Sequence, residues 1–214
     1  MGVNMVGFCI NDDEVCCDAS RNEIIRRYFN ALNKFAQGET NDSEVNKIAL
    51  LFNQAKIDVS YRRVVTAARS RAERDDAPSS AIELSDGTII TAQTSPLLGP
   101  SAALLLNAMK HLAGIDHSVK LIPQEMIEPI QAMKINCLHS LNPRLHTDEV
   151  LVALSVLSTR DENCKLALAE LEKLNGCQMH STVMLGEVDH KIFQKLGVGL
   201  TCDPAKKRNK KKDL

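Results

Sequence analysis

The chain has 214 residues, of which 44% are hydrophobic and 25% charged, and its formal net charge is -1. This composition is typical of an ordinary globular protein. Aromatic residues make up only 3% of the chain and tryptophan is absent. We therefore expect an aliphatic core and no base-stacking surface for single-stranded nucleic acid. The small net charge also argues against a whole-molecule electrostatic footprint for DNA or RNA.

The cysteines and the apolar segments bear on the compartment of the protein. Seven cysteines contain no C-x-x-C pair, and the chain is longer than the usual disulfide-stapled scaffold, so we expect reduced thiols. The N-terminus lacks a charged-then-apolar leader, and no apolar run approaches the length that spans a membrane. We therefore expect a cytoplasmic protein without a membrane partner.

The first third of the chain, residues 1–78, has a helical pattern. Apolar side chains recur there at three- and four-residue steps. Ser20 followed three residues later by Glu23 is a capping-box start for the first helix. We predict a small bundle of three helices at about residues 20–38, 43–55 and 61–74. The composition of Asp75–Ser80 indicates a linker after the bundle.

The remainder of the chain alternates between strands and helices. Asp86-Gly87 supplies the turn of a β-hairpin over about residues 81–91, since glycine accepts the positive φ that such turns need. Helices are then predicted at about residues 101–112, 124–135, 147–157, 162–174 and 188–196, and strands at 119–122, 178–185 and 198–202. This order indicates an α+β protein, with the helical bundle followed by a mixed β-sheet covered by helices on both faces, a three-layer α/β domain over residues 79–205.

A hairpin in first place is also typical of the cytidine-deaminase topology. A zinc deaminase carries H-x-E at the helix after the hairpin and P-C-x-x-C at a later helix, because the metal takes three protein ligands. Thr94–Ser101 holds no such ligand, and P-C-x-x-C is absent. We predict a deaminase-like topology without the zinc motif. His180 is expected on a strand and Glu187, Asp189 and His190 around a turn. They lack the spacing of a helical metal site, so we interpret the group as a surface turn and predict no metal.

The segment Ser140–Val150, S-L-N-P-R-L-H-T-D-E-V, places many polar groups directly before an apolar helix. The first turn of a helix offers unpaired N–H groups and a positive dipole end. Arg144 is suited to holding an anion through two hydrogen bonds, and His146 can transfer protons near neutral pH. We take His146 and Asp148 as candidate catalytic residues, and Arg144 and Asn142 as candidate ligand-binding residues.

Structural roles are the alternative for the same residues. Thr147 is well placed as an N-cap, and the helix dipole favours Asp148 and Glu149 in the first turn. Arg144 can equally pair with a structural carboxylate.

The loop before the helix at residues 101–112 is the second candidate. Thr94, Ser95, Gly99 and Ser101 can present hydroxyl and amide groups to a phosphate or a carboxylate, although no P-loop motif is present. Helix capping explains the serines equally well. We expect folding to bring this loop together with Arg144 so that both line one cleft.

Several segments resemble a known family: A-I-E-L-S-D-G-T-I-I-T, T-S-P-L-L-G-P-S-A-A-L-L-L-N-A, N-P-R-L-H-T-D-E-V-L-V-A-L and F-Q-K-L-G-V-G-L-T-C-D-P. They are similar to the C-terminal half of an uncharacterised family of bacteria and anaerobic protists, domain of unknown function 1846. The resemblance covers residues 1–204 in order. It implies members about twice this length, whose N-terminal half is a nucleotide-binding α/β domain with a glycine-rich stretch that this chain lacks.

Two functions follow as expectations. The first is the C-terminal part of a nucleotide- or phosphate-handling enzyme with a small anionic ligand, lacking its N-terminal nucleotide-binding half. The second is a truncated gene product or a non-catalytic module that assembles with itself or with a separate N-terminal partner. The sequence leaves the cofactor unknown. We expect residues 206–214 to be a basic disordered tail. The run Lys206–Lys212 is the one segment whose charge favours binding to a nucleic acid or another polyanion.

Overall fold

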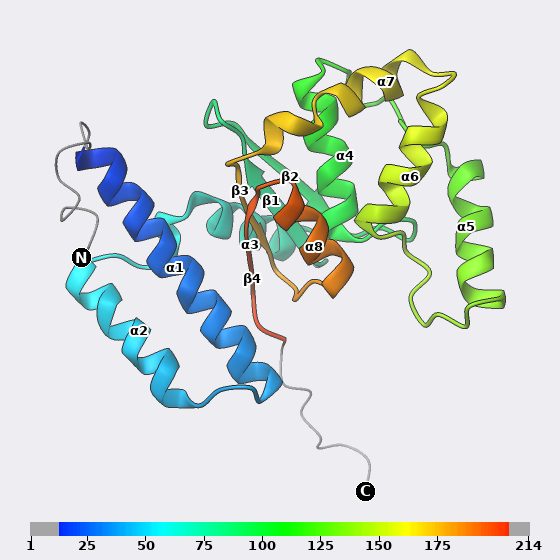
Figure 1. The fold of residues 1–214 in the computed structure, drawn as a ribbon. Helices are drawn as coiled ribbons and strands as arrows, with labels where there is room; N and C mark the ends of the chain where they lie inside the picture. Colours follow the sequence, from blue (N-terminus) through cyan, green and yellow to red (C-terminus); the bar gives the residue numbers. More distant parts are fainter. Residues whose placement is uncertain (1–12, 206–214) are drawn as a thin grey trace, which may run out of the picture. The chain divides into compact units, whose positions relative to one another are not determined.

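A computed structural model describes residues 13–205 of the chain (Figure 1). The described residues form two compact units, one containing residues 13–62 together with 204–205, the other containing Arg63–Asp203. The first residues of the chain and the basic tail lie outside the described residues. The expectations for these two ends therefore stay predictions.

The first unit consists of α1 (Asp13–Gln37), α2 (Asp42–Ala55) and the short 3-10 helix η2 (Val59–Tyr61). The predicted capping box is wrong, because α1 begins before Ser20 and the Ser20 hydroxyl donates to the Cys16 carbonyl at 2.8 Å inside the helix. The ring centroids of Tyr28 and Phe52 lie 4.8 Å apart, and this contact joins α1 to α2.

Helix α3 (Arg63–Asp75) belongs to the second unit and packs on the sheet. Its buried residues Val64 and Ala68 contact Ala81 of the first strand. The predicted bundle of three helices over residues 1–78 is therefore wrong in its third helix. The apolar stripe of α3 faces a sheet, and the periodicity of a helix does not say what covers its stripe.

Within residues 13–205 the sheet has four strands in the order β2-β1-β3-β4. Their bounds are β1 (Ser79–Glu83), β2 (Ile89–Gln93), β3 (Gln178–Ser181) and β4 (Gly199–Cys202). Strand β1 is antiparallel to both β2 and β3, and β3 is parallel to β4. Strands β2, β3 and β4 therefore run in the same direction. Gly87 adopts φ +82° in the β1–β2 turn, as the Asp-Gly pattern predicts.

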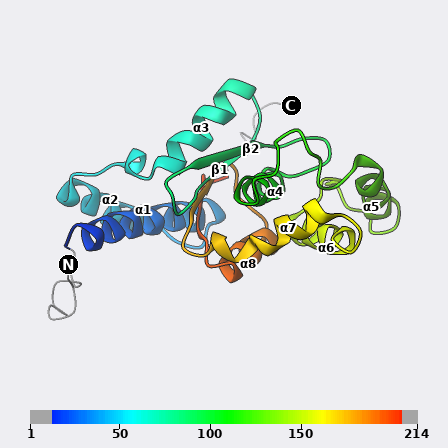
Figure 2. The same cartoon turned by 90° about the horizontal axis from the view of Figure 1, so that it is seen from above.

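Helices cover both faces of this mixed sheet, which confirms the α+β fold class. Helix α3 lies on one face, and α4 (Pro100–Leu112) and α8 (Glu187–Lys195) lie on the other (Figure 2). The connection between β2 and β3 also contains α5 (Gln124–Asn136), α6 (Thr147–Leu157), α7 (Glu162–Ala169) and the 3-10 helix η3 (Leu171–Leu174).

One predicted strand is absent. Residues 119–122 form a loop, in which the Lys110 ammonium group donates to the carbonyls of His117 and Val119 at 2.8 and 3.2 Å. The Cys164 thiol contacts the Leu121 carbonyl at 3.1 Å. Side chains therefore satisfy carbonyl groups that a neighbouring strand would otherwise have to satisfy.

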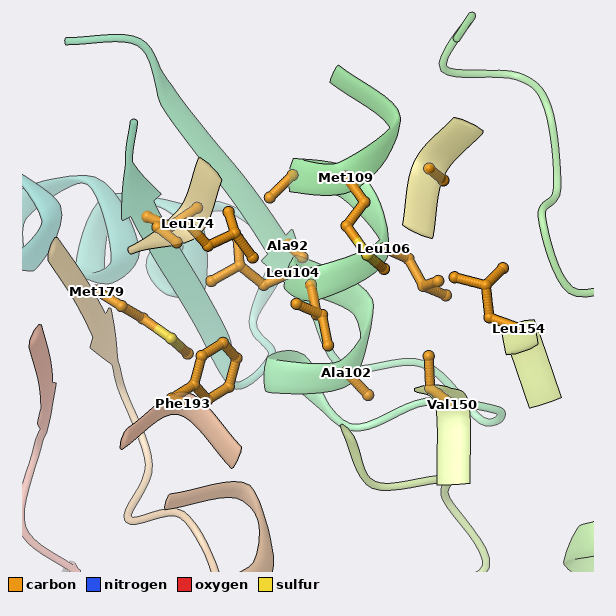
Figure 3. Close-up of a cluster of buried hydrophobic side chains, with 14 of the residues drawn as sticks. Ala92, Ala102, Leu104, Leu106, Met109, Val150, Leu154, Leu174, Met179 and Phe193 are labelled. Carbon is orange, nitrogen blue, oxygen red and sulfur yellow. The ribbon is translucent and has the colours of Figure 1, made fainter. Parts of the chain in front are cut away.

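The core of the second unit is mainly aliphatic, as the composition predicts. Figure 3 shows Leu104 and Met109 of α4 packed between Met179 of β3 and the side chains of α6, with Phe193 of α8 at one end. These residues are at most 1% exposed. Among the described residues, no helix combines the length and the apolar character that crossing a membrane requires. The cytoplasmic location stays a prediction.

Replacement of Leu104 by alanine tests this core. Leu104 is 0% exposed, so Leu104→Ala should lower the free energy of unfolding by about 2–5 kcal/mol through lost burial and a cavity. Leu166→Ala on α7 is the matched control, because that leucine is 46% exposed and its loss should cost less than about 1 kcal/mol. Urea unfolding followed by circular dichroism measures both. Equal losses would contradict the assignment of Leu104 to the core.

Candidate functional site

The two polar segments that the sequence singles out lie side by side. Leu98 and Leu145 form a parallel β-bridge. The Leu145 amide donates to the Leu97 carbonyl at 3.0 Å, and the Gly99 amide donates to the Leu145 carbonyl at 3.2 Å. Helices α4 and α6 begin directly after this bridge, so their N-terminal ends lie together at the lower end of both helices in Figure 1.

A third helix begins at the same edge of the sheet. Because β2 and β3 run in the same direction, the loops after Gln93 and after Ser181 leave the sheet at a common edge, and the second of them leads to α8. Ligand sites of α/β proteins gather outside the carboxyl ends of their strands. The loop before α4, the start of α6 and the start of α8 thus form one neighbourhood.

His146 and Asp189 form the central pair of this neighbourhood. His146 Nδ1 lies 3.2 Å from Asp189 Oδ2, and the two side chains are 36% and 5% exposed. The hydrogen bond with Asp189 raises the pKa of His146 above its ordinary value, against the opposing effect of partial burial. The imidazole is half-buried, is held by a carboxylate and still reaches solvent, which are the properties of a group that transfers protons.

Asp189 is fixed from a second side by α6. Its Oδ1 accepts hydrogen bonds from the Thr147 amide at 2.9 Å and from the Thr147 hydroxyl at 2.8 Å. Burial would raise the pKa of Asp189, but the hydrogen bonds from His146 and Thr147 outweigh it and lower the pKa. Asp189 therefore stays ionised while it orients the ring of His146.

Arg144 contacts the other candidate segment directly. Its Nε donates to the Ser95 carbonyl at 2.7 Å. Within the described part of the chain its two Nη groups have no partner, and no carboxylate pairs with it. The guanidinium group is thus positioned by the loop and keeps its outer donors for other contacts.

Lys134 was missed by the sequence analysis. It is 5% exposed on α5, and its ammonium group donates to the Arg144 carbonyl and to Glu149 Oε2, both at 2.7 Å. Glu149 Oε2 also accepts from the His146 amide at 2.8 Å. Lys134 and Glu149 thus hold the backbone on both sides of Leu145. A lysine on an amphipathic helix gives no sequence signal that distinguishes it from a solvent-exposed lysine.

The remaining candidates fall into two groups. The Thr94 hydroxyl donates to the Leu98 carbonyl, the Ser95 hydroxyl accepts from the amides of Leu97 and Leu98, and Asn142 Oδ1 accepts from the Arg144 amide. These three side chains hold their own loops. Gly99 and Ser101 lie at the start of α4, and Asp148 Oδ1 is a buried oxygen without a hydrogen-bond partner.

The interpretation of His180, Glu187, Asp189 and His190 as a surface turn is wrong for two of these four residues. Asp189 is 4% exposed and His180 is 0% exposed, whereas Glu187 and His190 are exposed. Asp189 follows Gly186 in the first turn of α8, where an acid is equally common as a simple favourable charge at a helix start. The sequence therefore gave no reason to connect it with His146, 43 positions away.

His180 belongs to a separate network on the α3 face of the sheet. Its Nδ1 lies 2.9 Å from the Thr201 hydroxyl, and its Nε2 lies 3.5 Å from Asp203. Arg69 also pairs with Asp203, at 2.6 Å. Burial would raise the pKa of Asp203, but the hydrogen bonds from His180 and Arg69 lower it to about 2. Among residues 13–205 no group of three or more His, Cys, Asp or Glu side chains is placed to hold a metal ion.

The second unit is thus an α+β unit with a helix-covered mixed sheet and a His–Asp pair at the carboxyl edge of its parallel strands. The sequence model described as domain of unknown function DUF1846, C-terminal, matches residues 60–211, and the corresponding N-terminal model matches residues 1–56. The chain belongs to this DUF1846 family.

Bacterial relatives share much of the sequence. A UPF0371 protein of Corynebacterium aurimucosum is 55% identical over 204 residues, which are 95% of this chain and 41% of that protein. A UPF0371 protein of Corynebacterium diphtheriae is 52% identical over 210 residues, 98% of this chain and 42% of the relative. A relative from Streptococcus pyogenes is 45% identical over 210 residues, with the same two shares. The chain thus spans about two fifths of the length of these relatives.

One part of the resemblance needs correction. The sequence analysis assigned the whole chain to the C-terminal half of the family, whereas residues 1–56 match the N-terminal model. The change from one family model to the other falls between residues 56 and 60, close to Arg62, where the two compact units divide. The repeated apolar steps of α1 and α2 carry no information on which family domain they belong to.

Titration of His146 tests the pair. We expect a pKa above 6.5 in the folded protein, and a lower value in Asp189→Asn, because the charged partner is removed. Since the folded-state pKa of His146 is raised, the pair stabilises the fold fully below about pH 6.5 and this contribution is lost as the pH rises through the folded-state value. NMR of the imidazole protons measures the titration, with the exposed His111 as an internal control. An unchanged pKa in Asp189→Asn would refute the pairing.

Lys134→Met tests whether the buried contacts of Lys134 stabilise the candidate site. It leaves the Glu149 carboxylate and the Arg144 carbonyl without their buried partner, so we expect a loss of about 2–3 kcal/mol in the free energy of unfolding. Lys165→Met is the control, since Lys165 and its partner Glu162 are 67% and 69% exposed and such surface pairs contribute less than about 1 kcal/mol. Adding Glu149→Gln to Lys134→Met should recover part of the loss. Additive effects of the two changes would argue against a shared network.

Proposed function

We propose that this chain is part of an enzyme that acts on a small substrate carrying a phosphate or carboxylate group. In this proposal the outer nitrogens of Arg144 bind the anionic group, and His146 donates or accepts a proton at the reacting atom. The observation that carries the proposal is the His146–Asp189 pair, at 3.2 Å, on the same segment as an arginine whose Nε is already held by Ser95.

The geometry of the pair supports an acid–base role over a structural one. A histidine that only stabilises a fold is usually enclosed, as His180 is at 0% exposure. His146 keeps 36% of its side chain exposed while Asp189 keeps 5%. A buried carboxylate behind a partly exposed imidazole fixes the ring and stabilises its protonated form, which is the role of the acid in other His–acid pairs.

Asp148 and Asn142 have supporting parts in this proposal. Asp148 Oδ1 is buried and without a hydrogen-bond partner, so it suits a hydroxyl or an amino group of the substrate. Asn142 holds the Arg144 amide through Oδ1 at 3.2 Å, and its role is to position the arginine. No cofactor enters the proposal.

A ligand screen tests this function. Nucleotides, phosphorylated metabolites and carboxylic acids are added to the whole chain, and a ligand at a hundredfold excess over its Kd should raise the Tm by about 5–10 °C. Arg144→Ala should abolish the rise, whereas Arg160→Ala, which removes an exposed arginine in the turn after α6, should leave it intact. Loss in both variants would indicate unspecific charge attraction. A rise that survives Arg144→Ala would exclude the proposed anion contact.

The acid–base role needs a separate readout. For a ligand that depends on Arg144, turnover should fall at least about a hundredfold in His146→Asn, because general acid–base catalysis contributes about that much. Its Kd should change far less. Turnover that survives His146→Asn would remove the catalytic role and leave a binding protein.

An interaction module is the second candidate. Large apolar side chains are exposed around α5 and α6, with Leu138 at 65%, Leu141 at 102%, Val152 at 66% and Val156 at 61%. Exposed apolar side chains in this number favour a partner surface when they are contiguous. Light scattering after gel filtration tests self-association, and a monomer at high concentration would count against a second copy as the partner.

A further inference from the structure

The carboxylate of Asp189 decides which nitrogen of His146 carries the proton. Its Oδ2 lies 3.2 Å from Nδ1, and an ionised carboxylate has no hydrogen to donate. The hydrogen bond between them therefore needs the proton on Nδ1. The neutral ring then has its lone pair on Nε2, which has no hydrogen-bond partner among residues 13–205.

The start of α6 offers Nδ1 a competing partner. His146 is the N-cap of α6, and an N-cap side chain can accept a hydrogen bond from the amide three residues on, which here belongs to Glu149. That arrangement needs a lone pair on Nδ1, which would then face the negative charge of Asp189. Hydrogen bonds with ionised groups are about twice as strong as those between neutral groups. The contact with Asp189 therefore sets the position of the proton.

Thr147 fixes the carboxylate in the orientation that this contact needs. The last torsion of an aspartate side chain has broad minima, so contacts with other groups must set its carboxyl plane. The hydroxyl and the amide of Thr147 donate to Asp189 Oδ1 at 2.8 and 2.9 Å, which leaves Oδ2 for His146. Thr147 is 0% exposed and Asp189 is 4% exposed, so water does not replace these donors.

The side chain of Thr147 is itself held in place. Threonine is branched at Cβ, which restricts its χ1 torsion, and the residue is fully buried where α6 packs on α8. His146 and Thr147 are neighbours in the chain and hold opposite oxygens of one carboxylate. The ring and the hydroxyl therefore keep a constant relation to each other and to Asp189.

We infer that Thr147 is a positioning residue, whose hydroxyl holds Asp189 so that His146 exchanges protons with the substrate through Nε2 alone. The inference rests on the proposed function and deepens it by naming the reacting atom. Neutral His146 takes the proton of a substrate hydroxyl or a bound water at Nε2, and the oxygen keeps the electron pair of the broken O–H bond. Asp189 stabilises the imidazolium, and Nε2 later returns the proton to the leaving atom. The Nδ1 proton stays on the ring throughout.

The other charged groups near His146 do not compete with Asp189. The hydrogen bond with Asp189 is the largest influence on the pKa of His146 and raises it. Partial burial and Lys134 lower that pKa, and Glu149 raises it. Glu149 Oε2 already accepts from the Lys134 ammonium group at 2.7 Å and from the His146 amide at 2.8 Å. Asp189 is therefore the carboxylate that remains for the ring.

Nitrogen NMR of the isotope-labelled whole chain measures the tautomer of His146, at a pH above its folded-state pKa so that the ring is neutral. His146→Asn identifies its signals. In the unmodified protein the Nδ1–H form should exceed the Nε2–H form at least about tenfold, since hydrogen bonds to charged groups contribute that much. Thr147→Val removes the hydroxyl and should lower this ratio at least about threefold, whereas Thr147→Ser keeps a hydroxyl and should change it less than about twofold.

Thr201→Val is the matched control. Thr201 is 2% exposed, and its hydroxyl donates to the Met179 carbonyl at 3.1 Å and lies 2.9 Å from Nδ1 of His180. It belongs to the separate network on the α3 face, so Thr201→Val should change the tautomer ratio of His146 less than about twofold. Loss of a buried hydroxyl can lower the Tm of either valine variant, but it moves the His146 tautomer only in Thr147→Val.

Three results would overturn the inference. The first is an unmodified protein in which the Nε2–H form of His146 predominates, and this result does not depend on whether any variant folds. The second is a ratio in Thr147→Val that equals the unmodified one, because Thr147 would then contribute only stability. The third is an equal fall in Thr147→Val and Thr201→Val, which would indicate a general loosening of the fold.

The proposed function fails separately. For a ligand that depends on Arg144, Thr147→Val should lower turnover at least about tenfold with little change in Kd, and Thr147→Ser should restore it. A tautomer ratio that falls in Thr147→Val, with turnover that survives His146→Asn, supports the positioning of the ring and contradicts the catalysis. Turnover that is lost in His146→Asn although the ring carries its proton on Nε2 contradicts the inference alone.

Discussion

The short parallel bridge between Leu98 and Leu145 is the contact on which the candidate site depends. It consists of two backbone hydrogen bonds, of 3.0 and 3.2 Å, and it fixes the starting points of α4 and α6 beside each other. Arg144 and Lys134 strengthen the same junction from either side, through Ser95 and through the Arg144 carbonyl. The bridge places Ser95, Arg144 and His146, which lie within a few residues of it, whereas Asp189 comes from α8 and Lys134 from α5.

The net charge at each helix start of the site depends on whether a carboxylate accepts a hydrogen bond from its first amides. Asp189 of α8 accepts from the first amide of α6, so the dipole of α6 and the imidazole of His146 share one carboxylate. Helix α4 receives none. Two neighbouring helix ends of the same sign therefore differ in their ability to attract an anion. Because a helix end carries only a partial charge, the full positive charge of Arg144 adds to that of α4.

Much of the fold could be predicted from periodicity and turn chemistry. The Asp-Gly hairpin and the bounds of α6 were predicted closely, because both have strong local signals. The loop at residues 119–122 was taken as a strand because its apolar residues fit either state, and the buried Lys110 that satisfies its carbonyls is recognisable only in three dimensions. The position of α3 on the sheet was missed for the same reason.

The site was predictable only in its local parts. The run from Arg144 to Asp148 stands out by its polar density, and the bridge to Gly99 agrees with the expectation that both segments meet. Asp189 and Lys134 were not predicted, because their partners lie 43 and 10 or 15 positions away. Pairing over such separations depends on the strand order, which no local pattern contains.

These separations also bear on how the protein folds. Ser95 and Arg144 are 49 positions apart and His146 and Asp189 are 43 apart. Contacts between distant positions form slowly, since the intervening chain must lose entropy before they are made. The region around His146 should therefore acquire its final arrangement late, after β3 has paired with β1. A nascent chain released before residue 189 would contain the arginine and the histidine without the carboxylate that orients them.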